Sequence, residues 1–287
     1  FEISGILRNK TWILGALIYF LGGVLQFIAF YFAPETVVNP IGAVLIVSNA
    51  ILSYFILNEP LFISHIVGII LIIVGNIIIV IFGPKNEQNN LSNEELKQLF
   101  IELPFICVFL VFTVLSVLSY VFSKYYERIV SAVQSNFLLF AYIYVAAYFG
   151  SLGVLFQKAI LYIMIKDLGH KMLDYLTYII GFGFLGCLFL MEYFRQKGLN
   201  IFGTSFVIPI YGIFQLIGSS IIGGIYFKEL YQLNSSRMIL FIFGIILTIL
   251  GIFILTYNMS TVYNKSKIAL QQLTQNGCLY MCKRKHL

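Results

Sequence analysis

The residues Ala33–Ala43, APETVVNPIGA, place several polar side chains between two long apolar runs. Glu35, Thr36 and Asn39 each offer a side-chain oxygen. Pro40 lacks an N–H group and clashes with the carbonyl group four residues earlier, so we expect the carbonyl oxygen of Thr36 to lose its helical hydrogen bond. Oxygen ligands without nitrogen or sulfur suit a hard cation. We therefore interpret this stretch as a candidate site for transient binding of a metal ion.

A second stretch, GTSFVIPIYG at 203–212, repeats this arrangement. When TVVNP is aligned with SFVIP, Thr36 falls on Ser205 and Pro40 on Pro209. Thr204 adds one more hydroxyl group beside Ser205. We expect both prolines to break their helices, and we expect the metal ligands to be Glu35, Thr36, Asn39 and Ser205.

A plain helix boundary is the alternative interpretation of the first stretch. Pro34 and Pro40 could end one helix and start the next, with Thr36 or Asn39 as a cap. The N-terminus of a helix carries a positive partial charge, which repels a cation. An ion site here therefore requires carbonyl and carboxylate groups, rather than amide hydrogens, to point at the ion.

Polar side chains in the other apolar runs are further candidates, because such groups are costly at membrane depth. Lys158 could balance Glu192 or another acid, or extend to the membrane surface. Glu59 and Glu229 are expected at helix ends, as caps or in loop ion pairs. The candidates for the ion pathway are Gln26, Glu35, Thr36, Asn39, Pro40, Lys158, Glu192, Thr204, Ser205 and Pro209.

The elements that must position these residues are membrane-spanning helices. Of the 287 residues, 60% are hydrophobic and only 10% are charged, whereas about a quarter are charged in a soluble domain. A span requires about 20 apolar residues. This rule predicts an all-α integral membrane protein with about eight transmembrane helices, at about 12–33, 37–57, 62–82, 103–122, 139–165, 173–194, 204–227 and 238–258. The fifth is overlong, so we expect it to be tilted, broken at 150–153 or partly interfacial.

The repeated motifs predict how these helices are arranged. GIILIIVG at 68–75 recurs as GIILTILG at 244–251, in the same order as the proline motifs. An odd number of spans separates the two copies, so they face opposite ways across the bilayer, as inverted repeats do in many transporters. We expect repeat 1 at about 1–122 and repeat 2 at about 137–258, in one transmembrane domain at 1–258. Five-helix repeats require a first helix ahead of Phe1, which we expect to be missing from this chain.

The loops on the N-terminal side carry more Lys and Arg than the opposite loops. The positive-inside rule then places both ends of the chain in the cytoplasm. Residues 259–287 form a basic tail, which indicates a surface facing anionic lipid rather than nucleic acid. His65, His170 and His286 form no metal-ligand pair, and the chain has no glycine-rich phosphate loop or GxSxG motif. We therefore expect neither an enzyme nor a bound cofactor.

Several of these motifs carry a family resemblance. Phe27–Glu59 resembles the signature of the NIPA-type magnesium transporters, within the drug/metabolite transporter superfamily. VIFGPK at 80–85, GSLGVLFQKA at 150–159 and NIFGTSFVIPIY at 200–211 agree in order and spacing. The resemblance implies an additional span ahead of Phe1, an extracellular N-terminus, and magnesium transport at the plasma membrane or endosomal membrane.

Four positions depart from the family pattern. A membrane acid is replaced by Gly23, the asparagine three residues later by Gln26, another asparagine by Gly203, and a glutamine by Met191. Magnesium binding would then depend on Glu35 or Glu192 as a substitute carboxylate.

We accordingly predict a transporter of magnesium, or of other divalent cations, that moves the ion down its electrochemical gradient. The expected partners are the magnesium ion as transported substrate and the lipid bilayer, with a homodimer as one option. The alternatives are a metabolite transporter of the same fold and a non-transporting membrane scaffold or receptor.

Overall fold

A computed structural model describes residues 10–57, 63–85, 93–129, 136–166, 175–202 and 204–255, and these parts of the chain contain helices and no strand. The helices are α2 (Lys10–Phe32), α3 (Glu35–Ile41), α4 (Val44–Leu57), α5 (Ile63–Phe82), α6 (Asn93–Ile101), α7 (Leu103–Ile129), α8 (Asn136–Lys166), α9 (Tyr175–Phe202), α10 (Thr204–Tyr226), the short 3-10 helix η1 (Leu230–Gln232) and a last helix, Ser235–Leu255. Apart from α6, the helices therefore follow the apolar runs of the sequence, as predicted.

Six helices of the described part are long and apolar enough to cross a membrane: α5, α7, α8, α9, α10 and the last helix. The other two predicted spans correspond to α2 and to the pair α3–α4, whose apolar stretches, Leu21–Phe30 and Glu35–Ser48, are shorter. The fold is thus all-helical and consistent with an integral membrane protein. Eight crossings and the inverted repeats stay predictions.

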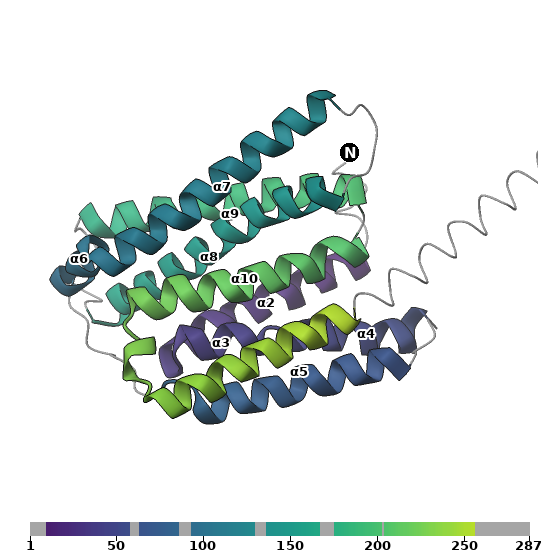
Figure 1. Cartoon of the computed structure of the whole chain (residues 1–287), viewed down its shortest axis with the longest axis horizontal. Helices are drawn as coiled ribbons and strands as arrows, with labels where there is room; N and C mark the ends of the chain where they lie inside the picture. Colours follow the sequence, from purple (N-terminus) through teal and green to yellow (C-terminus); the bar gives the residue numbers. More distant parts are fainter. Residues whose placement is uncertain are drawn as a thin grey trace, which may run out of the picture.

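Helix α8 lies at the centre of the bundle (Figure 1). Inside the molecule, 78% of its apolar window is buried, against 11% for α7 and 17% for α9. Clusters of buried apolar side chains connect α8 to α7, α9 and α10, and a separate cluster joins Phe30, Val38 and Val154. A side chain on the inner part of α8 is therefore shielded from lipid by the surrounding helices.

Glycines bring α5 and the last helix into close contact at one edge of the bundle (Figure 1). A methyl group added at Gly68 would lie 2.9 Å from the carbonyl oxygen of Gly251, and one at Gly75 would lie 2.8 Å from that of Gly244. The glycines at the start of one motif thus oppose those at the end of the other, because the two helices pack antiparallel.

The structure decides three local features that the sequence left open or did not reveal. Helix α8 runs unbroken through 150–153, because the small residues there accommodate neighbouring side chains: a methyl group at Gly150 would overlap the Tyr211 hydroxyl. The polar connection before α7 contains a helix, α6, whose Leu96 and Leu99 are buried. The second predicted span is divided into α3 and α4 at 42–43.

Candidate functional site

Glu35 is the first residue of α3, and its side chain is completely buried. The side chain amide of Asn39, one turn later, donates a long hydrogen bond of 3.5 Å to Glu35 Oε1. Glu35 Oε2 accepts no hydrogen bond from the described residues. A buried carboxylate oxygen without a partner is unfavourable, so this atom is an open acceptor inside the bundle.

Glu229 lies next to Glu35, although the two are far apart in sequence. Glu229 Oε1 accepts the backbone N–H of Glu35 at 2.9 Å and Lys158 Nζ at 2.6 Å. Glu229 Oε2 accepts the backbone N–H of Thr36 at 2.9 Å and its hydroxyl at 2.8 Å. The Glu229 carboxylate therefore satisfies the first amides of α3, which Pro34 leaves without a side-chain cap. Glu229 is therefore a helix cap, as expected, but it caps α3, which belongs to the other predicted repeat.

Lys158 is the positive charge of this group. Its side chain is 1% exposed on α8, and its ammonium group lies 4.8 Å from the ring centroid of Phe227 and 5.7 Å from that of Tyr162. The sequence offered Glu192 or another acid as the partner of Lys158, and in the structure Lys158 pairs with Glu229. Glu192 instead bonds to Arg195 and Gln196 on its own helix, α9.

The backbone after α10 directs Glu229 toward α3. Lys228 has a φ of 56°, in the left-handed region that non-glycine residues rarely adopt, and this turn ends α10 immediately before Glu229. The Lys228 ammonium group pairs with Glu102 Oε1 at 2.6 Å in a half-exposed ion pair. Two ion pairs thus flank the turn: Lys228 with Glu102 at the half-exposed surface, and Glu229 with Lys158 inside the bundle.

Two glycines of α10 create the space for the carboxylate of Glu35. A methyl group on Gly223 would overlap the Glu35 carboxyl group, and one on Gly224 would lie 2.8 Å from Thr36 Cγ2. Helix α10 therefore forms a wall of the site with its backbone. We call the group formed by Glu35, Thr36, Asn39, Lys158 and Glu229 the carboxylate cluster.

The remaining predicted residues lie apart from the carboxylate cluster or outside the described side chains. Gln26 is exposed on α2, and Glu192 is held on α9. Thr204 and Ser205 belong to α10, but their side chains, like all of Glu59, lie outside the described residues. The described contacts bring together Glu35, Thr36, Asn39 and Lys158 of the predicted candidates, and add Glu229.

The helix break expected at Pro209 was wrong, whereas the chain does break beside Pro40, because α3 ends one residue later at Ile41. Pro40 lies inside α3 and Pro209 inside α10. A proline removes a single amide donor, which a helix tolerates when neighbouring helices support it. The chain bends beside α3: Pro34 has a ψ of 147°, and a tight turn follows Pro40, where the Gly42 N–H donates to the Asn39 carbonyl oxygen at 2.9 Å.

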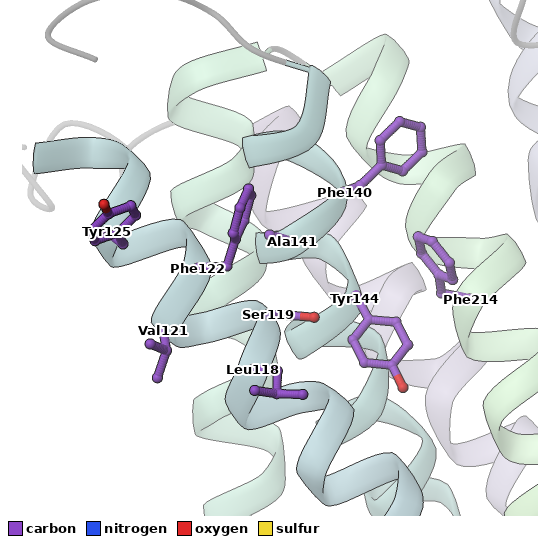
Figure 2. A pocket seen from close by; sticks show the side chains of 9 residues that line it. All are labelled: Leu118, Ser119, Val121, Phe122, Tyr125, Phe140, Ala141, Tyr144 and Phe214. Atoms are coloured by element: carbon purple, nitrogen blue, oxygen red, sulfur yellow. The ribbon is translucent and has the colours of Figure 1, made fainter. Parts of the chain in front are cut away.

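A pocket of about 660 Å³ opens between α7, α8 and α10, but it has a different chemistry. Figure 2 shows that its wall consists of apolar and aromatic side chains, with Ser119, Tyr125 and Tyr144 as the polar contributors. Tyr144 and Lys158 are separated by about 21 Å along α8 at the helical rise of 1.5 Å per residue. The pocket offers no charged ligand and is separate from the carboxylate cluster.

The carboxylate cluster has the chemistry of a weak site for a small hard cation. It supplies carboxylate, hydroxyl and amide oxygens, which are the ligands that such ions prefer. Among the described residues, no three His, Cys, Asp or Glu side chains gather as a metal-binding group. A site with two acids, one of them already paired with a lysine, favours passing rather than permanent occupancy.

Comparisons with known proteins identify the family of the chain. The sequence profile of the family described as magnesium transporter NIPA matches residues 4–261. The chain is 30% identical to probable magnesium transporter NIPA1 of Arabidopsis thaliana, with 88% of this chain and 73% of the relative covered. It is 32% identical to magnesium transporter NIPA4 of Homo sapiens (88% and 61% covered) and 27% identical to probable magnesium transporter NIPA8 of Arabidopsis thaliana (88% and 59% covered).

The chain spans about three fifths of the length of several of these relatives. No solved structure matches it significantly.

Proposed function

Because the chain belongs to the NIPA family of magnesium transporters, we propose that it carries magnesium ions across a membrane. The observation that carries the proposal is the unpartnered Oε2 atom of the fully buried Glu35, beside the carboxylate of Glu229. Magnesium dehydrates reluctantly and is held through one or two carboxylates while it keeps several waters. The carboxylate cluster matches that requirement.

The membrane potential supplies the driving force in this proposal. An inside-negative potential contributes about 2.3 kcal/mol per charge per 100 mV, and therefore about 4.6 kcal/mol for a divalent ion. Transport down the electrochemical gradient thus needs no coupled ion. The excess of Lys and Arg on the loops of the N-terminal side supports an orientation in which the carboxylate cluster lies near the extracellular side and the C-terminus in the cytoplasm.

Inverted repeats are the architecture that we propose for this transporter. The reciprocal approach of Gly68 to Gly251 and of Gly75 to Gly244 supports it, because a two-fold axis in the membrane plane would exchange the two contacts. The cap that Glu229 places on α3 is a second contact between the proposed halves. The carboxylate cluster would then lie where the halves meet.

The proposal is tested by magnesium uptake into proteoliposomes. Purified protein is reconstituted, an inside-negative potassium diffusion potential is imposed, and internal magnesium is followed with a fluorescent indicator. We expect uptake that increases with the potential and exceeds that of protein-free liposomes. Equal uptake in the two preparations would exclude magnesium transport and favour the scaffold alternative, whereas binding of an organic solute would favour the metabolite transporter.

A further inference from the structure

All the acceptor positions of the Glu229 carboxylate are occupied. A carboxylate offers about four lone-pair sites, and Glu229 uses them for the amides of Glu35 and Thr36, the Thr36 hydroxyl and the Lys158 ammonium group. An ion can therefore reach Glu229 only if one of these donors leaves. We propose that Lys158 is a tethered cation, which takes the place of the transported ion at Glu229 and is displaced when the ion enters. This inference rests on the proposed function.

Of the four donors, Lys158 is the charged one whose release is consistent with an intact fold. The Thr36 hydroxyl can also rotate away, but its release would leave the ammonium group in place against the arriving ion. The amides of Glu35 and Thr36 belong to the backbone of α3, and their position is fixed by the helix and by Pro34. The ammonium group is at the end of a long side chain with several rotatable bonds. The cap on α3 therefore persists when Lys158 moves, and Oε1 of Glu229 becomes available to a second cation.

The charges of the cluster favour such an exchange. When Glu35 and Glu229 are ionised and Lys158 is protonated, the cluster carries one net negative charge, because two carboxylates face a single ammonium group. A divalent ion between the carboxylates would neutralise both of them. Glu35 Oε2 accepts no hydrogen bond from the described residues, so it is the atom at which an arriving ion can bind before Lys158 leaves.

Two aromatic rings beside Lys158 offer a second position for the displaced ammonium group. It already lies 4.8 Å from the ring centroid of Phe227 and 5.7 Å from that of Tyr162. The quadrupole of an aromatic ring attracts an ammonium group above its face, and more strongly when the group is desolvated. Lys158 can thus move away from Glu229 toward these rings without entering the lipid, and return when the ion departs.

The exchange explains how an ion could leave a buried pair of carboxylates. Two acids without a competitor would hold a divalent ion tightly, whereas transport requires an ion that binds and then dissociates. The returning ammonium group restores the ion pair with Glu229 and so promotes release. Lys158 therefore determines the affinity of the site although it does not bind the ion.

Magnesium titration of the purified full chain in detergent tests this inference. The variants are Lys158→Met, which removes the charge at similar length, and Lys158→Gln, which also keeps a hydrogen-bond donor for Glu229. We expect both to bind magnesium about tenfold more tightly than the wild type or more, because a competing charge has been removed. Lys197→Met is the matched control; it removes a lysine of α9 that donates to the Tyr142 hydroxyl, far along α8 from Lys158, and is expected to change the affinity by less than about twofold.

A second substitution separates exchange from simple repulsion. If Lys158 occupies the place of the ion at Glu229, removing Lys158 should raise the affinity only while Glu229 is present. The double variant Lys158→Met, Glu229→Gln should then bind magnesium no more tightly than Glu229→Gln alone. A gain that persists in the double variant, or unchanged or weaker binding in Lys158→Met and Lys158→Gln, would overturn the inference. If Lys158→Met does not fold, Lys158→Gln and its combination with Glu229→Gln give the same comparison.

Failure of this inference is distinguishable from failure of the proposed function. Potential-driven magnesium uptake by the wild type together with no tighter binding by the Lys158 variants refutes the exchange alone. Absence of uptake by the wild type refutes the proposed function, whatever the affinities of the variants are.

Discussion

Replacing Glu35 by glutamine removes one negative charge from the carboxylate cluster and keeps the size of the side chain. A divalent ion about 4 Å from a carboxylate gains about 2 kcal/mol even at the dielectric constant of water. Because Glu35 is fully buried, the effective dielectric constant is lower and this value is a minimum. We therefore expect the dissociation constant for magnesium to rise at least about 30-fold.

The assay is a magnesium titration in detergent, together with the initial rate of potential-driven uptake into proteoliposomes. Glu192→Gln is the matched control, since the Glu192 carboxylate is bonded to Arg195 and Gln196 on α9 and is not part of the carboxylate cluster. We expect this control to retain the affinity and the flux of the wild type. Unchanged affinity in Glu35→Gln, or an equal loss in Glu192→Gln, would refute the assignment of the ion site to Glu35.

Three further substitutions test the packing around the site. Gly223→Ala should reduce magnesium uptake strongly because its methyl group overlaps the Glu35 carboxyl group, whereas Gly186→Ala, where the added methyl meets no atom within 4 Å, should leave uptake unchanged. Glu229→Ala should destabilise the protein by about 3–5 kcal/mol, because a buried ammonium group loses its partner, and thermal unfolding in detergent that matches the wild type would contradict the observed ion pair. Gly75→Val should lower the unfolding temperature by the equivalent of about 1–3 kcal/mol, since the side chain has to enter a gap of 2.8 Å to the Gly244 carbonyl oxygen.

Apart from α6, the helices of this protein could be predicted from the sequence because they correspond to apolar runs. Helix α6 was missed because it is short and polar, although Leu96, Leu99 and Phe100 at spacings of three and four residues were the signal for it. The break at 150–153, one of three alternatives for the overlong span, is absent from α8 for another reason. Small residues at 150–153 are compatible with a break or with close packing, and only the neighbouring Tyr211 decides between the two.

The candidate site could be predicted in part. Glu35, Thr36 and Asn39 follow from the polar stretch between apolar runs, and Lys158 from its place inside a span. The role of Glu229 was predicted only as a cap or loop partner, because its contact with α3 joins residues 194 positions apart. The motif Lys228-Glu229 at the end of an apolar run was a signal for a helix end, but a single sequence does not show which helix the carboxylate reaches.

The most direct test of the central claim is to locate the transported ion in a crystal structure of the full chain soaked in manganese, which replaces magnesium and scatters anomalously. We predict an anomalous peak beside Glu35 Oε2, either at a direct ligand distance of about 2.1 Å or one water molecule further away. The same map should show the Lys158 ammonium group moved from Glu229 toward Phe227. A peak beside Glu192 or in the aromatic pocket, with the carboxylate of Glu35 unliganded, would contradict the account.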